Sequence, residues 1–267
     1  MSSIRLGVWC YDYKFVKNPG LGIGKWQADK NALNVPGVIL TVEVNPVSKV
    51  DAATVKRVTK DWASVYSEFD VWRPLRLLRR IGPVLQGVTL DRSTSGDAYF
   101  PTVHIHALTR EFPVISLALG QRLVTSSGVQ EAVKFSRHVE DYPDASRRLA
   151  EQAGLSLDVR PTLKDIVREL RAFSISRQAQ GNPPAVNEVE DSVLIPAANG
   201  SVGIAEEGLQ LARDLLDSWP KVRLPLNWTS GEEWFDGLVA KAGNVDSLCE
   251  TVDSQIAFHK LAEVRDD

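Results

Sequence analysis

The sequence predicts an α+β fold: a mainly antiparallel sheet with flanking helices, followed by a helical C-terminal region. Three patterns in the 267 residues support this prediction. In the first half, short runs rich in β-branched residues end at glycine or proline, which is typical of strands. Between these runs, and throughout the chain after residue 203, apolar residues recur every three or four positions, which is typical of amphipathic helices. A stretch rich in Gln, Asn, Pro and Gly separates the two regions. We therefore expect an α+β domain over residues 1–173, a linker or long surface connection over 174–203, and a helical region over 204–267.

The first elements are two predicted strands with a glycine-rich loop between them. Residues 4–16 alternate aromatic and polar side chains and run into the loop KNPGLGIGKW. This loop does not match a phosphate-binding loop, because Pro19 and Trp26 stand where that motif needs Gly and Ser or Thr. The run VPGVILTVEV at residues 35–44 then predicts a buried strand that ends at Asn45 and Pro46.

The next elements predict part of a known sheet arrangement. Residues 51–80 have helical spacing and predict a helix that Pro74 interrupts or restarts. Gly82 and Pro83 end this helix, VLQGVTLD at residues 84–91 predicts a second strand, and YFPTVHIHAL at residues 99–108 predicts a third strand that pairs with the second. Strand, helix, strand and strand in this order are half of a ferredoxin-like sheet.

The later elements are predicted mainly as helices. The run VISLALGQRL at residues 114–123 fits a strand and a helix equally well. Residues 127–153 and 162–173 have helical spacing, and Gly154 is a plausible end for the first of these helices. In the tail, apolar stripes predict further helices, and Asn244 or Asp246 is placed to cap the last one.

Composition limits the class of protein. The net charge is −3 and the isoelectric point is about 5.9, which argues against a large basic surface for duplex nucleic acid. The two cysteines, Cys10 and Cys249, lie in unlike contexts and suggest neither a disulfide framework nor a cysteine zinc site. Because no segment has the length and apolarity of a signal peptide or a membrane span, we expect a cytoplasmic protein without a membrane partner.

His104 and His106 are separated by one residue within the third predicted strand. Side chains alternate along a strand, so both imidazoles are expected on one face, where rings ~6–7 Å apart can bind one divalent cation. Asp91 is a candidate third ligand if the hairpin pairs it opposite His104. The alternative is that the two histidines lie on a solvated sheet face without a ligand and that Asp91 is an ordinary hairpin acid.

These motifs resemble the HUH endonucleases, a family of replication initiators and relaxases in which a His-apolar-His strand of a ferredoxin-like sheet holds a catalytic metal ion. The resemblance covers residues 35–142 and consists of GVILTVEV, the helix after it, GVTLDR and YFPTVHIHAL. It implies that His104, His106 and Asp91 hold Mg²⁺ or Mn²⁺ and that the substrate is single-stranded DNA. It also implies a tyrosine nucleophile, whose phenol, with a pKa of about 10, needs a metal-activated phosphodiester.

Tyr142 is the only tyrosine after the histidines, so the resemblance assigns it the nucleophilic role. Lys134, His138 and Tyr142 are spaced four residues apart, and a continuous helix would place them on one face. The sequence departs from the family pattern after this point, because Pro143 adjoins Tyr142 and no lysine follows it at helical spacing.

The most basic stretch, WRPLRLLRR, has two interpretations. It is either the solvated face of a helix or a track for DNA phosphates. In the second case the nucleic-acid-binding residues are Arg73, Arg76, Arg79, Arg80 and Lys134.

The competing functional hypothesis is a non-catalytic interaction or scaffold protein with incidental histidines, whose C-terminal helices bind protein partners. Its support is the acidic net charge and the absence of another complete constellation, since the chain has neither a Gly-x-Ser-x-Gly turn nor a Gly-x-Gly-x-x-Gly motif. In this case Tyr142 packs at a helix end, and His259 is a core histidine that forms hydrogen bonds. The sequence leaves open whether the protein is an enzyme.

Overall fold

The computed structural model describes residues 50–219 and 229–266. The predicted strands at residues 4–16 and 35–44, and the glycine-rich loop between them, lie outside the described residues. The elements below all belong to one compact unit, residues 47–267.

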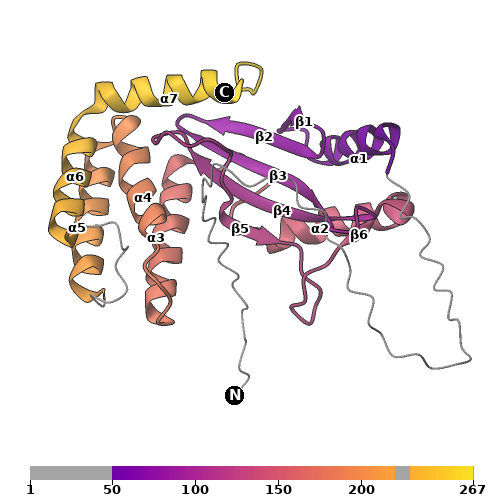
Figure 1. The fold of residues 1–267 in the computed structure, drawn as a ribbon, viewed down its shortest axis with the longest axis horizontal. Coiled ribbons are helices and arrows are strands. Elements are labelled where there is room, and N and C mark those ends of the chain that lie inside the picture. Colours follow the sequence, from indigo (N-terminus) through magenta and orange to yellow (C-terminus); the bar gives the residue numbers. More distant parts are fainter. Residues whose placement is uncertain (1–49, 220–228, 267) are drawn as a thin grey trace, which may run out of the picture. The chain divides into compact units, whose positions relative to one another are not determined.

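The described strands form one antiparallel sheet, which confirms the predicted α+β class (Figure 1). Neighbours in the order β1-β2-β3-β4-β5 are also neighbours in sequence, and β6 pairs with β4. The described sheet is therefore a meander. Its strands are β1 (Asp70–Arg73), β2 (Arg76–Ile81), β3 (Val84–Arg92), β4 (Ala98–Ala107), β5 (Ala118–Arg122) and β6 (Val133–Lys134).

The predicted helix over residues 51–80 is correct only in its first half. Helix α1 (Ala52–Val65) begins at Asp51, whose side chain accepts a hydrogen bond from the backbone N–H of Thr54. Residues 70–81 instead form the β1–β2 hairpin, with Leu75 in the left-handed region at its turn (φ 64°). Leu77 and Leu78 point to opposite faces of the sheet, because side chains alternate along a strand. Both are buried, since both faces are covered in this part of the sheet. Adjacent buried leucines hide the alternation of a strand, and the sequence therefore resembled a helix.

Three helices cover the first face of the sheet. These are α1, α2 (His138–Gln152), which follows a short 3₁₀ turn η1 (Phe135–Arg137), and α3 (Leu163–Ala179). The odd-numbered residues of β4 point to this face and pack with α1 and α2 at one end and with α3 at the other. Trp62, Leu149 and Leu170 are fully buried in these contacts, so this face is the larger part of the core.

The segment at residues 174–203, predicted as a linker, is largely helical and partly buried. Helix α3 extends to Ala179, and α4 (Val186–Ala198) occupies most of the remainder. Val189 and every residue from 191 to 197 are buried, including Pro196. The sequence did not predict this helix for two reasons. The residues around SVLIPAA are polar, and the helix is packed on several sides, so its apolar residues show little amphipathic periodicity.

The helical tail is confirmed. Helices α5 (Val202–Ser218), α6 (Gly231–Gly243) and α7 (Val245–His259) pack with α4 around a second core. Of the two predicted caps, Asn244 is the one that caps α7, since its side chain accepts a hydrogen bond from the backbone N–H of Ser247 at 3.2 Å. Among the described helices, none combines the length and the apolar character that crossing a membrane requires.

The second face of the sheet is partly covered by α7 and the residues after it (Figure 1). Leu78 of β2 and Leu85 of β3 pack here against Leu261 and Val264, and partly buried side chains of α7 complete the contact. The backbone N–H of Arg80 donates to the carbonyl of Arg265 at 3.1 Å, so residues after α7 join the edge of the sheet.

Candidate functional site: a buried histidine cluster

His104 and His106 project from the same face of β4, as predicted from their spacing, but this face is not solvated at their position. Their exposed fractions are 4% and 2%. His104 lies over Gly87 of β3, so closely that a Cβ at position 87 would overlap its ring. The pair is therefore enclosed within the protein.

Asp91 does not lie opposite His104, so the pairing on which its role as a third ligand depends is not formed. In the β3–β4 hairpin, Gly87 is opposite His104 and Asp91 is opposite Phe100. The hairpin closes tightly, with a hydrogen bond from the Ser93 N–H to the Ala98 carbonyl at 2.9 Å, and this tight closure sets the register. The Asp91 carboxylate instead faces Arg76 at 3.8 Å.

His106 has a defined tautomer. The backbone N–H of Ser116 donates to its Nδ1 at 3.0 Å, and the Ser116 hydroxyl lies 2.8 Å from the same atom. Because Nδ1 accepts this hydrogen bond, the neutral ring carries its proton on Nε2. A protonated Nε2 has no lone pair for a cation, and Nδ1 is already engaged. His106 is therefore poorly suited to ligate a metal ion.

Burial keeps both imidazoles neutral at pH 7. It lowers the pKa of His104 to about 4, with a smaller contribution from Arg76. It lowers the pKa of His106 to about 3, with further contributions from His259, His104 and Arg110. Neutral rings suit a ligand role, but across the described ranges no three His, Cys, Asp or Glu side chains are arranged to hold a metal ion.

The third member of the cluster is His259 of α7, which sequence reasoning assigned to the core without connecting it to the pair. Its ring is perpendicular to that of His106, with 5.6 Å between the centroids, and Phe112 also contacts His106. His104 Nδ1, His106 Nε2 and His259 Nε2 are buried and have no hydrogen-bond partner. The apolar stripe of the last helix placed His259 inside the protein, but nothing in the sequence indicated which strand it would meet.

Tyr142 lies on the other side of the sheet. It belongs to α2 and stacks on His138, with ring centroids 4.7 Å apart. His138 in turn bonds to Tyr99, an odd-numbered residue of β4 that points to the first face, whereas His104 and His106 point to the second. Lys134 lies in β6 and not on the helix, since α2 begins only at His138. The structure therefore does not bring the predicted nucleophile to the histidine pair.

The first face contains a polar chain that sequence reasoning missed. Trp62 Nε1 donates to the Tyr99 hydroxyl at 3.1 Å, that hydroxyl lies 2.7 Å from His138 Nδ1, and His138 Nε2 lies 3.0 Å from Asp61. Burial lowers the pKa of His138, although the bond to Asp61 opposes this effect. The chain resembles a proton relay, but Tyr99 and His138 are fully buried and only its Asp61 end reaches the surface. It fixes α1 and α2 to the sheet.

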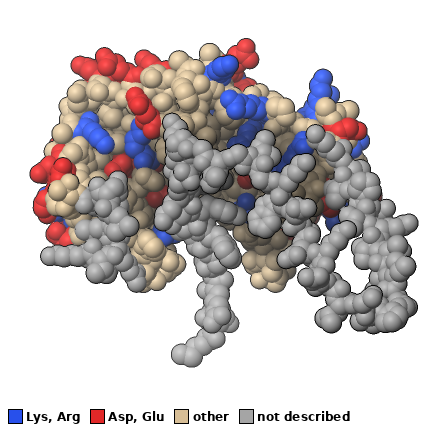
Figure 2. Space-filling model, in the orientation of Figure 1, with Lys and Arg blue, Asp and Glu red and all other residues tan. Residues whose placement is uncertain are grey.

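The basic stretch is a hairpin and presents no single basic face. Arg79 is fully buried on the first face and bonds to Gln86 and to the Ser156 carbonyl. Arg76 and Arg80 point to the second face, where they lie near Asp91 and Asp266, and Arg73 lies over the Trp72 ring. Figure 2 shows acidic side chains along the edge where α5, α6 and α7 lie. The arrangement does not resemble a track for phosphates.

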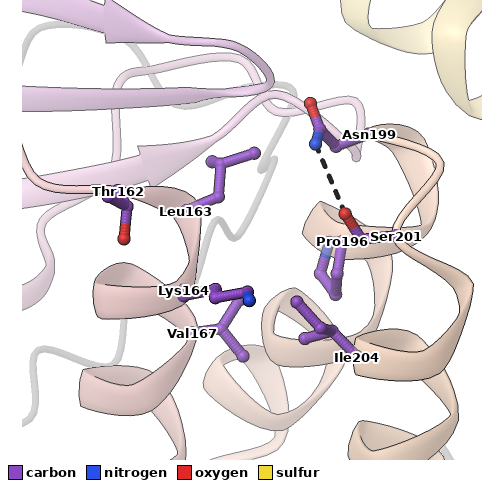
Figure 3. Close-up of a pocket in the computed structure, with 8 residues that line it drawn as sticks. All are labelled: Thr162, Leu163, Lys164, Val167, Pro196, Asn199, Ser201 and Ile204. Carbon is purple, nitrogen blue, oxygen red and sulfur yellow. Dashed lines mark hydrogen bonds between the residues drawn. The ribbon is translucent and has the colours of Figure 1, made fainter.

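Two shallow cavities lie among the helices and not at the histidines. The larger, about 320 Å³, is bounded by the first turn of α3, the end of α4 and the start of α5 (Figure 3). Leu163, Val167, Pro196 and Ile204 form its apolar wall, and among the described residues that line it Lys164 is the ionisable one. The smaller, about 250 Å³, lies between α4 and α6 beside Trp234. Neither is lined by a histidine or cysteine.

No protein-family model, curated protein or solved structure matches this chain. The function proposed below therefore rests only on the geometry of the described residues.

Proposed function

We propose that this protein is a non-catalytic interaction protein that binds a protein partner through an apolar surface beside α7. The observation that carries the proposal is the exposure of four apolar side chains on the loop after β4 and on α7, two elements that contact each other. These side chains are named here the Phe112 patch: Phe112, Val114 and Leu117 of the loop, and Phe258 of α7. Their exposed fractions are 40%, 58%, 43% and 60%. Exposed apolar side chains that form a contiguous patch are typical of binding sites for other proteins, and we infer that these four form one.

The loop of the Phe112 patch is held against α7. The backbone N–H of Phe112 donates to Gln255 Oε1 at 3.1 Å, one turn before Phe258. Arg110, at the start of the same loop, forms two bonds of 3.1 Å with Asp191 of α4. A surface held at both α4 and α7 costs less conformational entropy on binding than a mobile loop.

A nicking enzyme of the HUH type needs a metal ion and a tyrosine at the same phosphate. Here the histidine pair is buried, Asp91 lies opposite Phe100, and Tyr142 is on the other face of the sheet. These positions favour the interaction protein over the nuclease.

Site-specific crosslinking tests the proposal. A photo-crosslinking phenylalanine analogue replaces Phe258, and in a matched control it replaces Val202, which is 63% exposed at the start of α5. In cells of the native host we expect one protein to crosslink at position 258 and not at 202, and Phe112→Asp in the same chain to abolish the product. Crosslinking at neither position, or equally at both, would contradict the proposal.

A nicking assay tests the alternative. The purified protein is incubated with a labelled single strand and Mn²⁺ or Mg²⁺, and Mn²⁺ binding is measured by calorimetry. We expect neither cleavage nor metal binding. Cleavage by the wild type that is lost in Tyr142→Phe would replace the interaction protein with the nuclease.

A further inference from the structure

The histidine cluster lies at a contact between two parts of the fold that are distant in sequence. His104 and His106 come from β4, and His259 comes from the last turn of α7. Trp72 of β1 donates from Nε1 to the His259 carbonyl at 3.0 Å, and Val252 and Ile256 of α7 pack against the apolar residues around it. A change in the packing or charge of the three rings therefore weakens the contact between α7 and the sheet.

The three rings have no acidic partner. In the described part of the chain, His138 is the only histidine within 4.0 Å of a carboxylate, and it lies on the other face. The unpartnered nitrogens of the cluster are His104 Nδ1, His106 Nε2 and His259 Nε2. A proton added to one of these rings would place a positive charge in an apolar contact without compensation.

The charged side chains that act on the cluster are also cationic. Burial is the largest cause of the lowered pKa of each ring, and a nearby arginine lowers each pKa further. These arginines are Arg76 of β2 for His104, Arg110 for His106 and Arg73 of β1 for His259. A proton on one ring would also repel a proton on its neighbour.

Four acidic groups on elements around the cluster are paired with arginines. Asp191 and Glu190 of α4 face Arg110 at 2.9 and 3.7 Å. Beyond α7, Asp266 pairs with Arg80 at 2.8 Å, and Asp70 of β1 pairs with Arg265 at 3.0 Å. These four carboxylates are therefore held by arginines and not by the rings of the cluster.

The direction of the pH effect follows from these surroundings. Burial, the largest cause, lowers the pKa of His104 to about 4 and of His106 to about 3, from 6.5 in the unfolded chain, and it also lowers that of His259. Protons therefore bind more tightly to rings that have been released into water. The stability that these neutral rings contribute is complete above pH 6.5 and is lost as the pH falls.

We propose that the cluster of His104, His106 and His259 is an acid-sensitive contact, in which proton uptake by the rings opens the interface between α7 and the second face of the sheet. The core around α1 and α2 stays folded during this opening. The mechanism does not depend on the identity of a partner, so it stands or fails independently of the Phe112 patch.

Hydrogen exchange measured by mass spectrometry tests this proposal. Protection factors, which correct for the effect of pH on intrinsic exchange, are determined from pH 7.5 to pH 4 for peptides of α7 and of the β3–β4 hairpin. We expect α7 to lose protection at a higher pH than the hairpin. Loss of both at the same pH would show global unfolding and would contradict the proposal.

Two variants identify the titrating groups. In His106→Asn, the new side-chain oxygen can still accept from the Ser116 N–H, and His259→Asn removes the second ring. The double variant should keep the protection of α7 at pH 7.5 and lose it about one pH unit lower than the wild type. His259→Asn alone, which leaves His106 intact, should give a smaller shift in the same direction.

His138→Gln is the matched control, because it removes a buried histidine from the other face and should leave the α7 transition unchanged. An unchanged α7 transition in both cluster variants, or a shift in the control, would overturn the assignment.

Discussion

The imidazole of His104 occupies the space above Gly87 that a side chain would fill on the neighbouring strand. The two residues are direct cross-strand partners in the β3–β4 hairpin. A glycine in the middle of a strand costs stability, because it is flexible in the unfolded chain and contributes no packing. The close approach of the His104 ring explains why a residue without a side chain stands at position 87.

Gly87→Ala should therefore destabilise the protein, although alanine in a strand is normally less destabilising than glycine. The added methyl would overlap His104 and approach Leu78, and overpacking of this kind costs about 1–3 kcal/mol. Urea denaturation measures the cost. The same substitution in a His104→Ala background should cost much less, and equal costs in both backgrounds would show that the ring is not the cause.

Tyr99→Phe should cost more than removal of an ordinary buried hydroxyl. Tyr99 joins Trp62 to His138, so its loss leaves two buried groups without partners, at a cost of about 2–4 kcal/mol. Tyr66→Phe is the control, because that hydroxyl makes a single bond, to the Ser146 carbonyl at 2.7 Å. Thermal or urea denaturation compares the two, and equal losses would argue against a connected chain.

The buried neutral rings should make a contribution to global stability that falls as the pH is lowered from 7 to 4. The folded-state pKa values of His104, about 4, and His106, about 3, lie below the unfolded value of 6.5. Each ring that takes up a proton only on unfolding contributes a slope of about 1.4 kcal/mol per pH unit below 6.5. Urea denaturation at several pH values measures the slope. His106→Asn should reduce the slope by about this amount, and equal slopes in the wild type and the variant would contradict the burial of a neutral ring.

Arg110→Met should strongly destabilise the contact between the loop after β4 and α4. Arg110 is the arginine bound to Asp191, whose exposed fraction is 1%, and loss of one partner of a buried ion pair costs about 3–5 kcal/mol. Burial raises the pKa of Asp191 to about 7, and Arg110 opposes that effect. Without Arg110 this pKa would rise further, so the variant should gain stability as the pH falls from 8, whereas the wild-type carboxyl group takes up its proton only near pH 7. Arg110→Met/Asp191→Leu, which removes both charges, should not show this gain.

The sequence predicted those parts of the fold in which local pattern and burial agree. The β3–β4 hairpin and the helices of the tail, including the Asn244 cap, are examples. It failed where an element is buried on more than one side, because a strand with Leu77 and Leu78 on opposite faces, and the enclosed helix α4, lose their characteristic periods.

The candidate site was predictable only in part. The spacing of His104 and His106 determines that they share a face. It does not determine what covers that face, and α7, which brings His259, follows more than a hundred residues later in the chain. The register that separates Asp91 from His104 depends on the tight turn at Ser93–Ala98, and one residue of slip there moves every cross-strand pair.

The pairing of Arg265 and Asp266 with Asp70 and Arg80 has a consequence for folding during synthesis. The meander can form once β5 has left the ribosome, but Leu78 and Leu85 then still lack Leu261 and Val264. A nascent chain should therefore expose an apolar sheet surface until residues 261–266 have emerged, and it is in this interval that a chaperone would bind it.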